Sequence, residues 1–102
     1  MKTLVSIPHH DYPARVRSFL EARLQSLLKY RGHIVSMRAI CERQSALHRV
    51  EIVANVGHHA TLVVDARADA LDSAIDEACA KMSRVLSSYR RKRADLRRRS
   101  RR

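Results

Sequence analysis

Lysine and arginine are the residues whose number and spacing most clearly indicate a chemistry, and they gather at the C-terminal end. Nine of the 21 basic residues lie at positions 90–102, where Asp95 is the single acid. Positions 1–89 carry 12 basic and 9 acidic residues, a net charge of +3, which leaves +8 for the last thirteen positions. Clustered cations bind polyanions because binding releases condensed counterions. The composition therefore predicts a nucleic-acid-binding surface, although an anionic membrane or a targeting role would use the same charges.

A basic stripe on a predicted helix continues this charge toward the middle of the chain. At 100° per residue, a helix that begins near residue 69 places Lys81, Arg84 and Arg91 at neighbouring angles, beside or opposite its apolar face. In an earlier helix Arg23 falls within the apolar sector, so its guanidinium must extend toward the groove between the helices or toward the rim of that groove. Each cation alone could serve solubility, but the set exceeds that need. The predicted RNA-binding residues are Arg23, Lys29, Lys81, Arg84, Arg90, Arg91 and Lys92.

The histidines and cysteines do not predict a metal site or a catalytic centre. His9–His10 and His58–His59 are adjacent pairs, which lack the i, i+4 spacing that lets two imidazoles of a helix share a metal. Cys41 and Cys79 each lie in an apolar-patterned segment, as buried thiols of a reducing cytoplasm do. The sequence contains no glycine-rich phosphate loop and no local nucleophile motif. We therefore expect no enzymatic activity, no cofactor and no small-molecule substrate.

Four strands and two helices are predicted to position the cations. Residues 3–7 are rich in β-branched side chains, and residues 49–56 alternate apolar and polar side chains. Over residues 12–30 apolar side chains recur at steps of three and four, with Asp11 as the N-cap, and a longer stripe of the same kind begins after Asp69. The predicted strands are 3–7, 33–44, 49–56 and 60–66, and the predicted helices are 12–30 and 69–89.

These elements predict an α+β fold, a two-layer sandwich in the order β-α-β-β-β-α. The last three strands form an antiparallel meander, and the first completes a four-stranded sheet with both helices on one face. A chain of 102 residues supports one domain, to which we assign residues 1–93. Residues 94–102 have no periodic apolar face, which predicts a flexible basic tail. The start does not resemble a signal peptide, and no run of about 18 apolar residues could span a membrane.

The second predicted helix resembles a known protein family. The stretch DALDSAIDEACAKMSRVLSSYRRK, residues 69–92, is similar to the helix that begins DMYAAID in the short ribosome hibernation-promoting factor and Y-protein family. This family is also called the sigma-54 modulation or ribosome-associated inhibitor family. Residues 74–76 match AID, and Lys81, Arg84 and Leu86 match the basic and apolar positions that follow.

The resemblance covers most of residues 3–93 and includes RSFLEARLQSLLKY of the first helix. It implies a non-enzymatic cytoplasmic protein, monomeric when free, that binds the small ribosomal subunit through basic helix residues on ribosomal RNA. Such a protein blocks the region of messenger RNA and transfer RNA and inhibits translation in idle cells, as in stationary phase or stress. The residues themselves leave a second hypothesis open, a general RNA- or anionic-surface-binding protein that acts through its basic tail.

Overall fold

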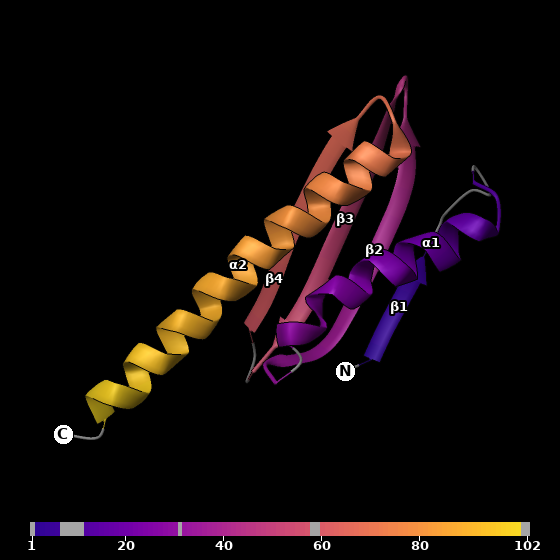
Figure 1. Cartoon of the computed structure of the whole chain (residues 1–102). Helices are drawn as coiled ribbons and strands as arrows, with labels where there is room; N and C mark the ends of the chain where they lie inside the picture. Colours follow the sequence, from indigo (N-terminus) through magenta and orange to yellow (C-terminus); the bar gives the residue numbers. More distant parts are fainter. Residues whose placement is uncertain (1, 7–11, 31, 58–59, 101–102) are drawn as a thin grey trace.

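Two helices cover one side of a sheet, and the second helix extends well beyond it (Figure 1). The computed structural model describes residues 2–6, 12–30, 32–57 and 60–100. In chain order the elements are β1 (Lys2–Ser6), α1 (Arg15–Leu24), the 3-10 helix η2 (Gln25–Tyr30), β2 (Ile34–Gln44), β3 (Leu47–Val56), β4 (Ala60–Ala68) and α2 (Leu71–Ser100).

The strands follow the order β1-β2-β3-β4 across the sheet, but they pair in two different ways. β2 is antiparallel to β3, and β3 is antiparallel to β4, so that Arg38 lies opposite Val53 and Val53 opposite Val63. β1 pairs in parallel with the outer edge of β2. Parallel neighbours need a crossover connection, which α1 and η2 provide. Between the other strands the chain has two residues, 45–46, after β2 and three residues, 57–59, after β3.

The expected four-stranded sheet needs a correction in its pairing: the antiparallel sheet consists of three strands, β2, β3 and β4, and β1 is added to it in parallel. The five-residue β1 is attached to its edge by parallel pairing alone. The alternation of residues 49–56 indicated the central strand of these three, because alternation results from one buried and one solvated sheet face. The composition of residues 3–7 held no information about strand direction, which the intervening helices determine.

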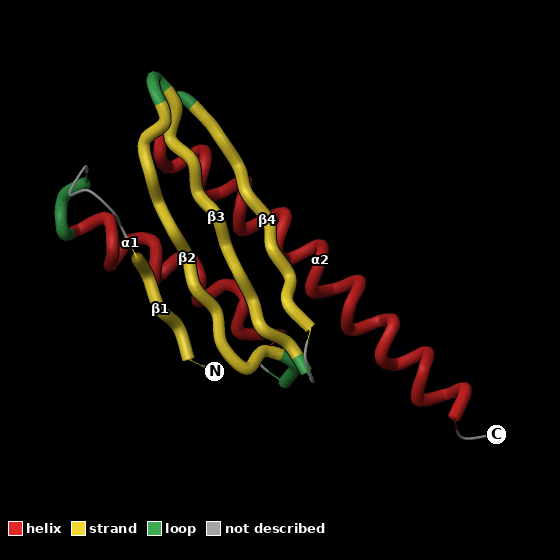
Figure 2. Tube along the Cα trace, turned by 180° about the vertical axis from the view of Figure 1, so that it is seen from behind, coloured by secondary structure: helices red, strands yellow, loops and turns green. Residues whose placement is uncertain are grey.

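The core lies between the sheet and the two helices, which cover the same sheet face (Figure 2). On the opposite face Val35 and Val63 are exposed, so no second layer covers the described strands there. Each fully buried aliphatic side chain contributes about 1.5–3 kcal/mol relative to an exposed one, so this single interface holds the helices in place. Fully buried residues of the core include Leu20, Met37, Ile52, Ile75 and Met82.

Both cysteines belong to this core. Cys41 and Cys79 are buried and free, as the apolar patterns around them predicted. Burial raises the pKa of each thiol, because a thiolate would lose its hydration in the apolar layer. The two residues therefore pack as small apolar side chains.

The first helix is shorter than predicted and tightens toward its end. α1 stops at Leu24, and the chain continues as the 3-10 helix η2. Leu24 and Leu27 are both buried, and their spacing of three residues matches the three residues per turn of a 3-10 helix. The N-cap is Ala14, which makes no side-chain capping bond, and the predicted N-cap Asp11 lies outside the described residues.

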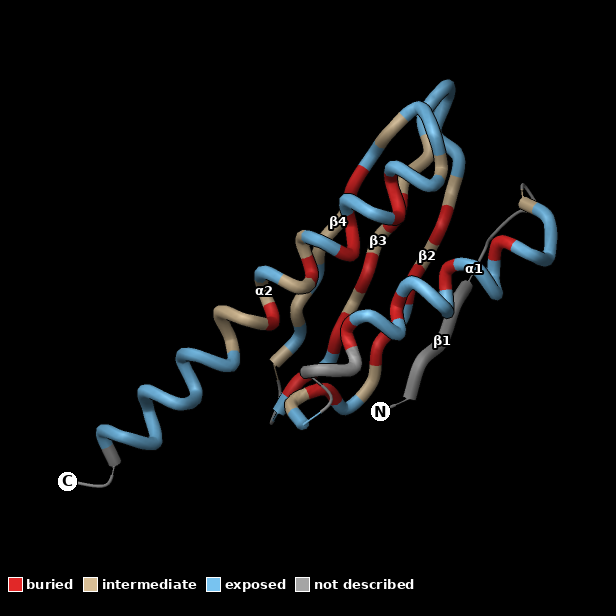
Figure 3. The backbone as a smooth tube through the Cα atoms, viewed as in Figure 1, coloured by how far each residue is buried: buried red, intermediate tan, exposed pale blue. Residues whose placement is uncertain are grey.

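The second helix is longer than predicted. α2 runs for 30 residues and includes residues 94–100, where the sequence predicted a flexible tail. The continuation has a local cause: alanine, leucine and arginine favour helix, and neither glycine nor proline follows Gly57. Residues 90–99 are all exposed and extend past the sheet (Figure 3). The domain boundary at residue 93 and the mobility of the tail in solution stay predictions.

Candidate nucleic-acid interface

α2 presents one face to the sheet and leaves the rest of its circumference to polar side chains. At 100° per residue, Lys81 falls on the flank beside β4 and Asp76 on the flank beside α1. Arg84 and Arg91 fall on the side away from the sheet. The buried residues that define the packed face are Ala74, Ile75, Ala78, Cys79, Met82 and Leu86.

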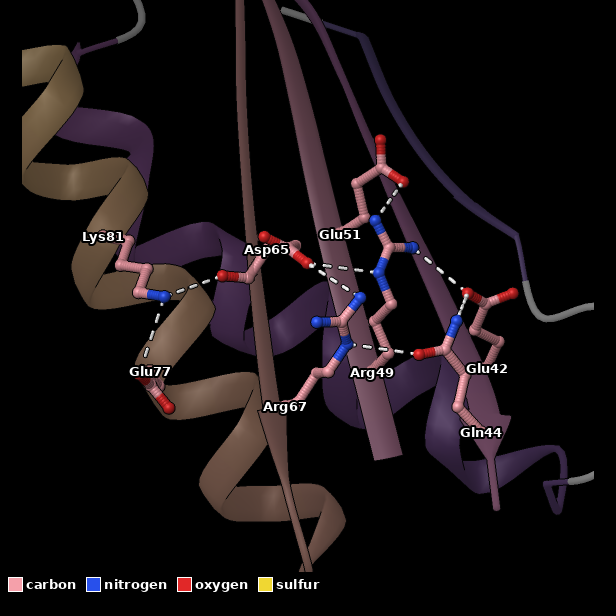
Figure 4. Close-up of polar contacts among 8 residues, drawn as sticks. All are labelled: Glu42, Gln44, Arg49, Glu51, Asp65, Arg67, Glu77 and Lys81. Atoms are coloured by element: carbon pink, nitrogen blue, oxygen red, sulfur yellow. Dashed lines mark hydrogen bonds and ion pairs between the residues drawn. The ribbon is translucent and has the colours of Figure 1, made fainter. Parts of the chain in front are cut away.

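Lys81 connects α2 to the edge of the sheet. Its Nζ donates a hydrogen bond of 2.8 Å to the backbone carbonyl of Asp65 in β4 (Figure 4). The same Nζ lies 3.6 Å from Oε1 of Glu77, one turn earlier on α2. Lys81 therefore has a structural role in addition to any contact with an anion, and part of its charge is compensated by Glu77.

Arg23 connects the two helices. Its guanidinium donates to the carboxylate of Asp76, and both side chains are about half exposed. The side chain thus lies in the groove between α1 and α2, as its position within the apolar sector of the first helix predicted. The ion pair compensates the charge of Arg23, so this arginine orients α1 more than it adds to a positive surface.

The remaining basic residues of α2 are exposed. Within the described part of the chain, the Arg84 guanidinium has no ion-pair or hydrogen-bond partner. Nη2 of Arg91 lies 3.4 Å from the hydroxyl oxygen of Ser88, a long and weak hydrogen bond. Arg90 and Lys92 are also exposed and lie about 100° to either side of Arg91 around the helix axis. All four side chains are therefore exposed to the solvent on the outer side or the projecting end of α2.

The predicted residues do not form one compact patch. Arg23 lies on the α1 flank and Lys81 on the β4 flank, while the other α2 cations lie on the outer side and the projecting end. Lys29 belongs to η2, but its side chain lies outside the described residues. Apart from Arg23, which belongs to α1, the described residues lie on helix α2 but not on one face of it. Their contact with RNA stays a prediction.

The open sheet face carries a charge network that sequence reasoning missed. The guanidinium of Arg49 in β3 lies 3.1 Å from a carboxylate oxygen of Glu42, 3.1 Å from one of Glu51 and 3.2 Å from one of Asp65 (Figure 4). Arg67 adds a longer contact of 4.0 Å to Asp65. Nothing in the sequence indicated this network, because its members come from three different strands. They lie close together only through the register in which β2, β3 and β4 pair.

This network also affects where an anion can bind. Burial lowers the pKa of Arg49, but the hydrogen bonds to Glu51 and Asp65 outweigh that effect and raise the pKa above its ordinary value. The network combines two arginines with three carboxylates, so it presents no excess of positive charge. The network therefore adds no positive charge to the open sheet face.

Other chemistries find no support among the described residues. No three histidine, cysteine or acidic side chains converge there in a way that could hold a metal ion. His9, His10, His58 and His59 lie outside the described residues. None of the described helices is long and apolar enough to cross a membrane.

Comparison with known proteins identifies the family. A sequence model of the family described as "Sigma 54 modulation protein / S30EA ribosomal protein" matches residues 4–94. A search of curated proteins finds no significant match.

Two solved structures have a similar fold. A ribosomal subunit interface protein from Coxiella burnetii has a TM-score of 0.78 and 19% identity, over 88% of this chain and 98% of that one. The N-terminal domain of Protein Y from Thermus thermophilus has a TM-score of 0.73 and 18% identity, over 87% of this chain and 99% of that one. The resemblance visible in residues 69–92 is confirmed by the family match over most of the chain: the protein belongs to the sigma 54 modulation protein / S30EA ribosomal protein family.

Proposed function

We propose that the protein is a ribosome hibernation factor. In this role it binds the small ribosomal subunit through helix cations on ribosomal RNA, covers the region of messenger RNA and transfer RNA, and inhibits translation in idle cells. The family membership supports a ribosomal partner, and one protein of similar fold is described as a ribosomal subunit interface protein. The role calls for a cytoplasmic monomer without catalysis or cofactor, because occupying a site is sufficient to block it.

The observation that carries this proposal is the continuity of α2, which joins the core to the exposed cations. Ile75 and Met82 are fully buried and set the direction of the helix on the sheet. With the helix formed, Arg84 and Arg91 lie about 10 Å apart along the axis, from seven residues at about 1.5 Å each. A rigid array of cations favours a particular arrangement of phosphates, whereas a mobile chain binds any polyanion.

A general RNA- or anionic-surface-binding function is the second candidate, and the end of α2 favours it. Residues 90–100 carry seven basic residues and one acid. That charge suffices for salt-dependent binding to any polyanion. Under this alternative, binding needs no defined orientation of the folded part.

Sedimentation of the protein with separated small and large ribosomal subunits distinguishes the two candidates. We expect saturable binding to the small subunit, a footprint on ribosomal RNA at one location, and competition with messenger RNA or transfer RNA. Equal binding to both subunits without a localised footprint, and displacement by heparin as easily as by RNA, would favour the second candidate.

A further inference from the structure

The end of α2 is a helix without a surface to pack on. We call residues 90–100 the projecting helix. Tyr89 is the last partly buried residue before it, and its ring makes an edge contact with His33, with centroids 5.8 Å apart. From Arg90 to Arg99 every residue is exposed, and Figure 3 shows this part of the helix clear of the sheet. At 1.5 Å per residue the projecting helix is about 15 Å long.

Cations surround the projecting helix on all sides. Arg90, Arg91, Lys92 and Arg93 are consecutive, so steps of 100° distribute them around the whole circumference. Residues 97–99 repeat this distribution seven positions later. The only apolar side chains are those of Ala94 and Leu96. A helix that lies on a membrane needs a continuous apolar face, which this arrangement lacks.

The same charges oppose the helix in the absence of an anion. Within the projecting helix an ion pair joins Arg98 to Asp95, the single acid among its seven bases. Like charges three and four residues apart, such as Arg93 and Arg97, destabilise a helix. An isolated helix of this length is marginal in water even with favourable residues. A ligand that binds the cations more tightly when the segment is helical therefore stabilises the helix, because binding shifts the equilibrium toward the bound conformation.

A ligand for such a helix must present negative charge on more than one side. A flat surface would meet only about half of the cations, whereas two phosphate strands that flank a groove meet nearly all of them. The major groove of regular A-form RNA is deep and narrow, so a helix with arginines all round does not fit an uninterrupted duplex. A bulge or an internal loop interrupts the stacking and opens the groove.

We infer that the projecting helix inserts, as a helix, between two phosphate strands of structured RNA where a bulge or internal loop widens the groove. This inference rests on the proposed function for the class of partner, RNA. It adds a second RNA contact, outside the folded domain, that depends on helix formation and not on charge alone.

A proline substitution distinguishes the contribution of helical structure to RNA affinity from the contribution of charge. Ala94→Pro keeps all cations, but it removes a helical hydrogen bond and clashes with the carbonyl of Arg90. Ala94→Gln is the matched control, because glutamine is a good helix former at an exposed site. Both variants lie beyond Tyr89, so the folded core is unchanged. Affinity is measured by fluorescence anisotropy on three RNAs: a hairpin with an internal bulge, a fully paired hairpin, and a single-stranded RNA of equal length.

The full-length protein is expected to prefer the bulged hairpin and to gain helical signal in far-UV circular dichroism when it binds. Ala94→Pro should weaken that binding by about 10-fold to 100-fold, the effect of a proline in a helix interior expressed as affinity. Ala94→Gln should stay within about twofold. The parent preference for the bulged hairpin should disappear in the proline variant.

Three outcomes would overturn the inference. Parent-like affinity of Ala94→Pro would show that the segment acts as a flexible cluster of cations. Equal affinity of the parent for all three RNAs would exclude a widened groove as the ligand. Tighter binding to anionic vesicles or to an acidic peptide than to the bulged hairpin would assign the segment another partner. Sedimentation with the small subunit tests the proposed function independently, because Ala94→Pro retains Arg84 and Arg91 and should still sediment with that subunit.

Discussion

Residues 71–89 and residues 90–100 belong to the same helix, but different forces hold them. In the first part apolar side chains repeat at helical spacing against the sheet, and three acids accompany two bases. In the second part seven bases accompany one acid, and Leu96, the only large apolar side chain, is 53% exposed. Packing therefore stabilises the first part, whereas intrinsic propensity and local contacts such as the Arg98–Asp95 ion pair support the second against charge repulsion. The comparison separates the residues that build the domain from those that add charge to it.

Ile75→Asp should break the packed part and unfold the protein. Ile75 is fully buried at the centre of the face that α2 presents to the sheet. A carboxylate at this position loses its hydration without gaining a partner, which costs several kcal/mol, a large share of the stability of a small domain. Urea unfolding followed by circular dichroism measures the effect.

Ala80→Asp is the matched control for this substitution. Ala80 is exposed on the same helix, so the added charge stays hydrated. The urea unfolding curve of this variant should resemble that of the parent. A cooperative, parent-like transition for Ile75→Asp would show that the assigned helix face is wrong.

Arg84→Gln combined with Arg91→Gln should weaken binding to the small subunit without loss of stability. Both side chains are exposed on the outer side of α2, so each substitution should change the free energy of unfolding by no more than about 0.5 kcal/mol. Loss of two phosphate contacts at fixed positions should reduce affinity by about 10-fold to 100-fold. Lys81 is better left in place, because its hydrogen bond to Asp65 ties the helix to β4.

The matched control removes the same charge from the sheet side. Arg38 on β2 and Arg67 on β4 are exposed and point to the open sheet face, and the double variant Arg38→Gln with Arg67→Gln should bind nearly as well as the parent. An equal loss of affinity in both double variants would mean that net charge, rather than the outer side of α2, determines binding.

Truncation after Arg93 should change the salt dependence of binding more than its location. The deletion removes five arginines and Asp95. The slope of log affinity against log salt should become shallower by up to about five units, and by less where a charge makes no contact. Footprints on ribosomal RNA should keep their position, because the folded part sets the orientation. An unchanged slope would show that the segment does not touch RNA, and loss of the localised footprint would make the segment the element that selects the site.

The periodicity of apolar residues allowed the sequence to predict the buried faces of strands and helices. It did not predict strand pairing or the partners of polar side chains. The alternation in residues 49–56 and the stripe from Ala74 to Leu86 identified β3 and the packed part of α2, because burial leaves a repeat in the sequence. The parallel pairing of β1 and the Arg49 network left no such repeat, since both depend on register between distant segments. The sequence predicted the side of the helix on which Arg23 and Lys81 lie. Their partners, the carboxylate of Asp76 and the backbone carbonyl of Asp65, became known only from the tertiary structure.

The smallest predicted effect concerns the point where the two parts of α2 meet. Gly57 has a φ of +52°, and a Cβ added there would meet the hydroxyl of Tyr89. The Gly57 amide also donates a hydrogen bond of 2.9 Å to the carbonyl of His33, which keeps this turn against the Tyr89 ring. Gly57→Ala should therefore destabilise the protein by about 1–2 kcal/mol, from left-handed backbone strain and from displacement of Tyr89.

A double-mutant cycle with Tyr89→Phe divides these two contributions. In the Gly57→Ala, Tyr89→Phe double variant the contact with the hydroxyl is absent, so the loss should shrink toward the backbone strain alone. Gly32→Ala is the control, because a Cβ at Gly32 meets nothing within 4 Å and its φ is not positive. Additive effects of Gly57→Ala and Tyr89→Phe in urea unfolding would show that the added Cβ does not displace the Tyr89 hydroxyl, and the whole loss would then come from the left-handed backbone at residue 57.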